Sequence, residues 1–192
     1  HKPEPGVDVT VSYMRQLESE AEPGSTWVYK TGETNLIGVL ASAAANKPLA
    51  DYLSEKIWQP YGMEQDAVWM TDQGGHERGG CCLSMTLRDY ARLGQFLLED
   101  GVAQGKPMVP ERWVELATSY QNDFGKERGY GFFMWLIPGG YAAEGIFGQQ
   151  IFVFPQDKLV IAVNSAWASA DKEQDWIAQE EMARAVRASL VK

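Results

Sequence analysis

Cysteine and histidine are scarce in this 192-residue sequence, which contains two of each. The cysteines are adjacent, Cys81 and Cys82, and adjacent cysteines rarely pair because an ordinary disulfide needs a longer reach between Cα atoms. We therefore expect two free, buried thiols. With only His1 and His76 besides, the sequence has no zinc-ligand spacing, and we predict no metal site.

Basic residues are also few. Lys and Arg number 17 against 26 Asp and Glu, which gives a net charge of −9. Phosphate backbones are bound by clustered Lys and Arg, so this balance argues against nucleic acid and, equally, against an anionic membrane surface as partner. The longest apolar stretch, residues 36–45, is far shorter than the roughly 18 residues of a membrane span and is predicted to be a buried helix.

Most catalytic motifs are missing too, among them GxxxxGK[ST], GxGxxG, HExxH and GxSxG. Two Ser-x-x-Lys tetrads, 169–172 and 189–192, have the form of a serine acyl-transfer nucleophile with its lysine. The first is predicted to lie in a polar loop and the second at the C-terminus, where chains fray. We expect neither to be a nucleophile, and no organic cofactor is indicated.

What the sequence does contain is 45% apolar residues and 22 aromatics, enough for one folded domain with a core. Helical spacing of apolar residues predicts helices first, and β-rich runs then predict strands before a final helix. This order is typical of an α+β fold, in which helices pack on an antiparallel sheet. We predict one domain over 1–192, helical over about 7–120, with the sheet and last helix over about 128–192. Helices are expected at 7–20, 35–45, 48–60, 84–99 and from 110, strands at 129–136, 150–154 and 159–164, and the last helix at 175–190.

Five segments, in order along the chain, resemble the class C-type serine β-lactamases and their esterase and amidase relatives. Tyr29-Lys30-Thr31 is similar to the family's Tyr-x-Asn element, and Thr86-Leu87-Arg88-Asp89 to its Thr-x-Arg-Asp element. The spacing looks closest to the branch of 6-aminohexanoate-oligomer hydrolases and esterases. The resemblance implies a β-lactamase/transpeptidase-like fold and a hydrolase that cleaves amide or ester bonds through an acyl-serine. The five segments are 23–38, 47–63, 79–95, 130–135 and 145–149.

The resemblance implies a role for Tyr29 as the tyrosine that shuttles protons beside the nucleophile. A phenol with a pKa near 10 does this at neutral pH only with help from neighbouring cations or a lysine relay. The alternative is a core tyrosine with a satisfied hydroxyl. Thr31 stands where the family has Asn, so a substrate contact here lacks the amide's paired donor and acceptor.

The third family element, Lys/His-x-Gly on a strand, corresponds to Ala143-Glu144-Gly145. The cation is absent, which disfavours recognition of a substrate carboxylate and favours a neutral amide or ester. The resemblance implies that the backbone N–H of Ile146 helps to form an oxyanion hole, a role that needs no particular side chain. Glu144 and Gly145 then line the substrate site. Two more candidate pocket walls, for which core packing is the alternative, are Trp135 and Tyr141.

The family's nucleophilic Ser-x-x-Lys precedes its tyrosine element, and the 28 residues before Tyr29 contain no such tetrad. We therefore expect this sequence to be the C-terminal portion of a serine hydrolase, inactive alone, whose partners are the N-terminal fragment of the same protein and a small amide or ester substrate. Because Thr31 and Ala143 depart from the family's pattern, the alternative is a catalytically inactive binding or regulatory module.

Overall fold

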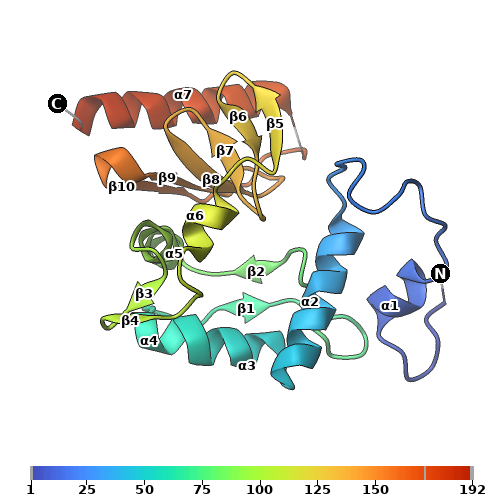
Figure 1. Cartoon of the computed structure of the whole chain (residues 1–192). Coiled ribbons are helices and arrows are strands. Elements are labelled where there is room, and N and C mark those ends of the chain that lie inside the picture. Colours follow the sequence, from blue (N-terminus) through green and yellow to red (C-terminus); the bar gives the residue numbers. More distant parts are fainter. Residues whose placement is uncertain (1, 171, 191–192) are drawn as a thin grey trace. The chain divides into compact units, whose positions relative to one another are not determined.

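The computed structural model describes residues 2–170 and 172–190 (Figure 1). The chain divides into two units, one made of residues up to 62 together with 66–85, the other of 63–65 together with 86–192. Each unit is described by itself. Among the described residues, no helix combines the length and the apolar character needed to cross a membrane.

The first unit is mostly helical. A short helix and a longer one are followed by an unbroken helical stretch, whose middle turn has π geometry and which ends at Gly62, where φ is +76°. The predicted helices near 35–45 and 48–60 are confirmed, whereas the helix expected at 7–20 is only six residues long. The elements are α1 (Val9–Met14), α2 (Thr31–Ala45), α3 (Leu49–Leu53), η1 (Ser54–Trp58), α4 (Gln59–Tyr61), β1 (Val68–Trp69) and β2 (Leu83–Ser84).

Helix α2 is less buried than its composition predicts. Gly38 is its buried residue, and Ile37 and Leu40 are exposed, so the expectation of a buried helix is wrong. The physical reason is that its neighbours in the unit, α1, α3 and the backbone at Gly79, cover only part of the helix surface. A Cβ atom on Gly38 would lie 2.8 Å from the Cα atom of Gly79, so only glycine permits this approach.

The cysteine prediction is also wrong. Cys81 and Cys82 form a disulfide bond with each other, and both residues are exposed. The backbone turns at Cys82, where φ is +74°. This turn brings two side chains together that would point apart on an extended chain.

The second unit contains a six-stranded antiparallel sheet in the order β10-β9-β8-β7-β6-β5, so each strand lies beside its neighbour in sequence. The predicted strands at 150–154 and 159–164 are confirmed, the second ending one residue earlier, at Val163. The helix predicted at 84–99 is also confirmed and begins after Thr86, whose side chain caps it by accepting the Asp89 N–H. The elements are α5 (Leu87–Leu98), β3 (Val102–Ala103), β4 (Lys106–Pro107), α6 (Trp113–Ala117), β5 (Asn122–Gly125), β6 (Arg128–Tyr130), β7 (Trp135–Ile137), β8 (Gly140–Glu144), β9 (Gln150–Phe154), η2 (Pro155–Asp157), β10 (Leu159–Val163) and α7 (Glu173–Leu190).

The single strand expected at 129–136 is instead two strands, β6 and β7, joined by a tight turn. The Gly131 N–H donates to the Met134 carbonyl at 2.9 Å, and Phe133 has a φ of +63°. Tyr130 and Trp135 face each other across the hairpin. The unbroken apolar run hides this turn in the sequence.

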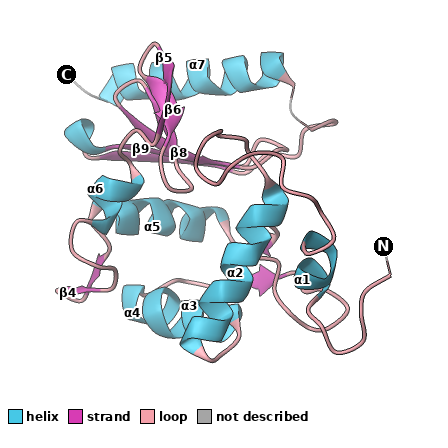
Figure 2. Cartoon of the chain, turned by 45° about the vertical axis from the view of Figure 1, so that its right-hand side comes forward, coloured by secondary structure: helices cyan, strands magenta, loops and turns pink. Residues whose placement is uncertain are grey.

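Both faces of the sheet are covered within this unit, and Figure 2 shows α5 and α7 on opposite sides of it. Tyr141 and Ile151 belong to the cluster that packs against Leu93 and Leu97 of α5. Ala142 and Phe152 belong to the cluster that includes Ala183 of α7. The α+β fold predicted from the sequence, with helices on an antiparallel sheet, is therefore confirmed, and the alternation along β8 assigns its residues to the two faces.

Candidate active site

Tyr29 lies in the first unit, in the irregular segment directly before α2. Its side chain is 53% exposed, and the adjoining Trp27 and Val28 are exposed as well. The next residue, Lys30, precedes the first turn of α2 and pairs with Glu20 at 2.5 Å. This exposure does not fit the alternative of a core tyrosine, and within its unit the phenol is accessible to a reacting group.

The first turn of α2 rests on the backbone of residues 79–80. The Gly80 N–H donates to Asn35 Oδ1 at 2.7 Å, and a Cβ atom on Gly80 would lie 3.1 Å from the Thr31 carbonyl oxygen. Thr31 itself is exposed. The segment that carries Tyr29 and Thr31 is therefore anchored at its α2 end, although the substrate contact of Thr31 stays a prediction.

Ile146 lies in the second unit, in the exposed turn between β8 and β9. The turn is closed by two backbone hydrogen bonds: Gly145 N–H donates to the Gln149 carbonyl at 2.7 Å, and Gly148 N–H to the Gly145 carbonyl at 2.8 Å. Gly148 needs to be glycine because its φ is +84° and a Cβ atom would lie 2.3 Å from the Trp167 ring. Neither bond uses the Ile146 N–H, the group predicted to bind the oxyanion.

Glu144, at the end of β8, lies on the face of the sheet that α7 covers, as does Ala142 two residues before it. Burial, and then the nearby carboxylate of Glu180, raise the pKa of Glu144 to about 7, and Arg128 and Gln150 oppose this shift. Arg128 forms a two-pronged ion pair with Glu180, with one contact at 2.8 Å. The charged groups near Glu144 thus lie on its own sheet and on α7. The role of Glu144 in substrate binding stays a prediction.

The two candidate pocket walls differ in their surroundings. Tyr141 is buried in the core cluster with Leu136 and Val153, and burial, followed by the charge of Asp100, raises the pKa of its phenol. Trp135 is partly buried and packs edge-on against Tyr130, with ring centroids 4.8 Å apart. For Tyr141 this geometry favours the core-packing alternative.

Neither Ser-x-x-Lys tetrad is fully described. Ser169 lies in the loop between β10 and α7, as expected, but Asp171 of that tetrad lies outside the described residues. The second tetrad begins with Ser189, in the last turn of α7, and its final two residues also lie outside them.

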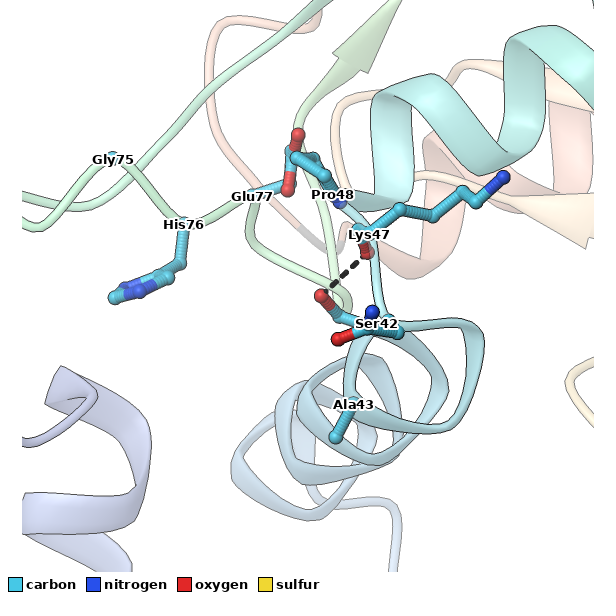
Figure 3. A pocket seen from close by; sticks show the side chains of 8 residues that line it. Ser42, Ala43, Lys47, Pro48, Gly75, His76 and Glu77 are labelled. Atoms are coloured by element: carbon cyan, nitrogen blue, oxygen red, sulfur yellow. Dashed lines mark hydrogen bonds between the residues drawn. The ribbon is translucent and has the colours of Figure 1, made fainter.

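The described part of the first unit contains, among its hollows, a larger and a smaller cavity, and Tyr29 and Thr31 line neither of them. The larger, of about 350 Å³, lies between the C-terminal end of α2 and residues 75–77 (Figure 3). Its polar groups are largely engaged: Ser42 donates to the Lys47 carbonyl at 2.8 Å, and Glu77 accepts from the N–H groups of Leu49 and Ala50 at the start of α3. The smaller cavity, of about 270 Å³, is lined by Ala50, Leu53, Ser54, Trp58, Asp66, Ala67, Trp69 and Leu83.

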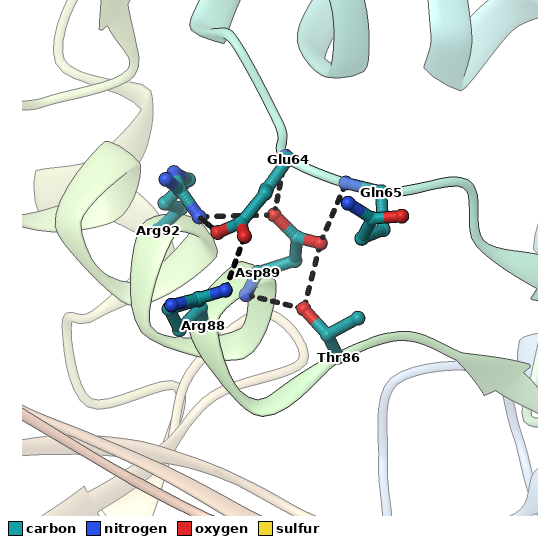
Figure 4. Close-up of polar contacts among 6 residues, drawn as sticks. All are labelled: Glu64, Gln65, Thr86, Arg88, Asp89 and Arg92. Carbon is teal, nitrogen blue, oxygen red and sulfur yellow. Dashed lines mark hydrogen bonds and ion pairs between the residues drawn. The ribbon is translucent and has the colours of Figure 1, made fainter.

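Asp89 is a buried carboxylate whose role the sequence reasoning missed. It is fully buried and accepts hydrogen bonds from Glu64 N–H at 2.7 Å, Gln65 N–H at 3.2 Å and the Thr86 hydroxyl at 2.8 Å (Figure 4). Burial alone would raise its pKa, but these donors together hold the pKa below the usual value. The signal was the Thr86-x-x-Asp89 spacing, a variant of the helix capping box. Asp89 is thus a structural centre that fixes residues 64–65 onto α5.

Comparison with known proteins adds a family-level match. The Beta-lactamase family model matches residues 2–184. The 6-aminohexanoate-dimer hydrolase of Paenarthrobacter ureafaciens is 26% identical over 178 residues, which cover 84% of this chain and 44% of that protein.

Solved structures are similar as well. A Bacillus anthracis protein described as a candidate 6-aminohexanoate-dimer hydrolase matches with a TM-score of 0.81 and 27% identity, over 95% of this chain and 50% of that one. A Mycobacterium bovis β-lactamase matches with a TM-score of 0.72 and 18% identity, over 91% and 68%. The chain spans about half the length of the curated relatives it matches.

Proposed function

Because this chain belongs to the β-lactamase family, we propose that it forms part of a serine hydrolase that cleaves amide or ester bonds, with its Ser-x-x-Lys nucleophile in polypeptide N-terminal to the sequence given. The observation that carries the proposal is the placement of Tyr29: a half-exposed phenol at the position of the family's proton-shuttling tyrosine, directly before an anchored helix.

In the proposed reaction the serine oxygen attacks the substrate carbonyl. The serine proton passes to the Tyr29 oxygen while the phenol hands its own proton to the neutral amine of the tetrad's lysine. The Ile146 N–H donates to the oxyanion that develops on the carbonyl oxygen. When the C–N or C–O bond breaks, Tyr29 returns the proton to the leaving amine or alcohol. Water then attacks the acyl-serine by the reverse sequence, which releases the acid and restores the serine.

The exposed apolar residues of the first unit fit this proposal. Trp27, Val28 and Tyr29 are exposed in series, and Ile37 and Leu40 are exposed on α2. Large apolar side chains exposed next to one another are typical of an interface. We assign it to contact with the N-terminal portion, which also carries the serine.

The proposed substrate is a small, uncharged amide or ester. The relative from P. ureafaciens is named for a dimer of 6-aminohexanoate, which supports an amide bond as the point of cleavage. Ala143 supplies no cation at the position where the family has Lys or His, so this chain offers a substrate carboxylate no partner there.

The test compares Tyr29→Phe with Tyr120→Phe in the protein that includes the N-terminal portion. Both tyrosines are about half exposed, so each substitution removes one hydroxyl from a similar setting. With p-nitrophenyl acetate, an uncharged ester, as substrate, we expect Tyr29→Phe to lower kcat by about 10²–10⁴-fold, the usual contribution of a proton-transferring side chain, and Tyr120→Phe to leave it unchanged. Equal activities of the two variants would overturn the role of Tyr29.

The second candidate is an inactive binding or regulatory module, which the departures at Thr31 and Ala143 favour. Intact-protein mass after treatment with a fluorophosphonate separates the two functions. A serine hydrolase gains the mass of one phosphonyl group at the Ser-x-x-Lys serine, whereas an inactive module gains none.

A further inference from the structure

Three side chains that can ligate a metal meet in the first unit, although they lie far apart in the sequence. His76 Nδ1 lies 3.3 Å from Asp8 Oδ2 and 3.4 Å from both carboxylate oxygens of Asp72. One ligand atom from each residue lies within 4.8 Å of those from the other two. Spacing along the sequence could not reveal this set, because Asp8 precedes α1 and the other two residues are in the loop before β2.

A single hydrogen bond from the ring joins His76 to one carboxylate at a time. Two carboxylates face the same ring nitrogen, and that nitrogen carries at most one proton to donate. A metal ion would bind the imidazole lone pair and both carboxylates together. With bonds of about 2.0–2.1 Å, neighbouring ligands of a tetrahedral Zn²⁺ lie about 3.3–3.4 Å apart, which matches the observed separations around His76.

The carboxylates are held in place by backbone groups. Asp8 Oδ1 accepts the Val11 N–H at 3.0 Å, which leaves Oδ2 facing His76. Asp72 Oδ1 accepts the N–H groups of Gly74 at 2.7 Å and His76 at 3.0 Å. Such outer contacts orient metal ligands in known sites.

The two carboxylates of the cluster are mostly buried, whereas the imidazole is mostly exposed. Asp8 and Asp72 are only 16% and 12% exposed, so both carboxylates are largely shielded from water. The imidazole of His76 is 57% exposed and points away from Lys47 and Pro48 (Figure 3). The buried side therefore supplies the two carboxylates, and the open side leaves room for water ligands.

We propose that Asp8, Asp72 and His76 bind one first-row divalent metal ion, with Zn²⁺ as the best match to one nitrogen and two oxygen ligands. The ion ties the N-terminal end of α1 to the loop that leads into β2. Its role is structural and independent of the hydrolase reaction. Mg²⁺ binds much more weakly, because it prefers oxygen ligands and keeps its water shell.

The test is calorimetric titration of the protein with Zn²⁺ and with Mg²⁺, alongside His76→Ala and the control Asp51→Asn. Asp51 is an exposed carboxylate of α3 that takes no part in the cluster. We expect one equivalent of Zn²⁺ to bind in the micromolar range, at least about tenfold more weakly in His76→Ala and unchanged in Asp51→Asn. Zn²⁺ binding should also raise the Tm by about 5 °C, and EDTA should reverse this.

Three outcomes would overturn the proposal: no saturable Zn²⁺ binding by the unsubstituted protein, equal affinity in His76→Ala, or Mg²⁺ binding as tight as Zn²⁺ binding. Circular dichroism shows whether His76→Ala is folded. If it is not, the unsubstituted protein with Co²⁺ decides. Tetrahedral Co²⁺ absorbs visible light much more strongly than the octahedral aqua ion, so the absence of this absorption counts against the site.

Discussion

Replacing Asp89 by Asn tests whether this buried carboxylate stabilises the second unit. Asn has nearly the same shape, so the substitution changes charge and hydrogen bonding without creating a cavity. In the native protein three donors converge on the carboxylate: the N–H groups of Glu64 and Gln65 and the Thr86 hydroxyl. An amide keeps one acceptor oxygen and turns an NH₂ group toward donors, so at least one buried N–H loses its partner.

The expected loss follows from these contacts. A hydrogen bond to a charged group contributes about 1.5–3 kcal/mol, and an unsatisfied buried donor costs about 1–3 kcal/mol. Because the Thr86 hydroxyl can rotate, we count one to two lost bonds and expect the free energy of unfolding to fall by about 3 kcal/mol. For a protein of this length that corresponds to a Tm lower by roughly 6–12 °C.

The pH dependence gives a second measurement. The folded-state pKa of Asp89 lies below the usual value of 3.8, since the three donors and Arg92 outweigh burial. The stabilisation is therefore fully present above about pH 4 and is lost as the pH falls through the lower folded-state pKa. Urea unfolding at pH 7 should separate the variant from the unsubstituted protein, and the gap should narrow in acid.

Asp123→Asn is the matched control. Asp123 is exposed and accepts a single backbone bond, from Gly125 N–H at 2.7 Å, so the same substitution should cost less than about 1 kcal/mol. If the two variants unfold at the same urea concentration at pH 7, or if the Asp89 difference does not shrink in acid, the assignment of Asp89 as a buried, charged hub is refuted.

Three further outcomes are expected. Gly38→Ala should lower the Tm despite the better helix propensity of Ala, because the added Cβ would lie 2.8 Å from Gly79 Cα. The raised pKa of Glu144 means that the unsubstituted protein loses up to about 3 kcal/mol of stability as the pH rises from 4.5 to about 7 and this carboxyl group ionises. Glu144→Gln does not ionise, so it should become more stable relative to the unsubstituted protein over that range. Urea unfolding at pH 5 and pH 8 measures the difference. Thiol titration of the denatured protein should find no free thiol before reduction and two after it, from Cys81 and Cys82.

The sequence predicted those helices and strands whose formation depends on residues close together in the chain. β9 and β10 match their expected positions because a turn with Pro155 and Asp157 separates two β-rich runs. Helix α5 begins where Thr86 can cap it. The turn between β6 and β7 escaped prediction because Phe132, Phe133 and Met134 continue the apolar run without any turn residue after Gly131.

Features that depend on distant residues could not be predicted in this way. The low burial of α2 depends on how much of its surface the rest of the unit covers, and its closest contact, between Gly38 and Gly79, joins residues far apart in the sequence. The same holds for Asp8 and His76, which no spacing rule connects. For the candidate active site, the sequence named Tyr29 and Ile146 through family resemblance, and the structure adds their exposure and their anchoring.

Some residues that carry the family resemblance have a clear structural role, and others do not. Gly38 and Gly79 permit close backbone contact in the first unit, and a Cβ atom on Gly94 of α5 would lie 2.5 Å from Val160 in the second. Asp89 binds backbone N–H groups. Packing and hydrogen bonding account for all four, so they are evidence for the fold and not for the reaction. Tyr29 differs from them in its exposure, because half of this residue faces solvent. The proposed hydrolysis therefore depends on that phenol far more than on the number of matching motifs.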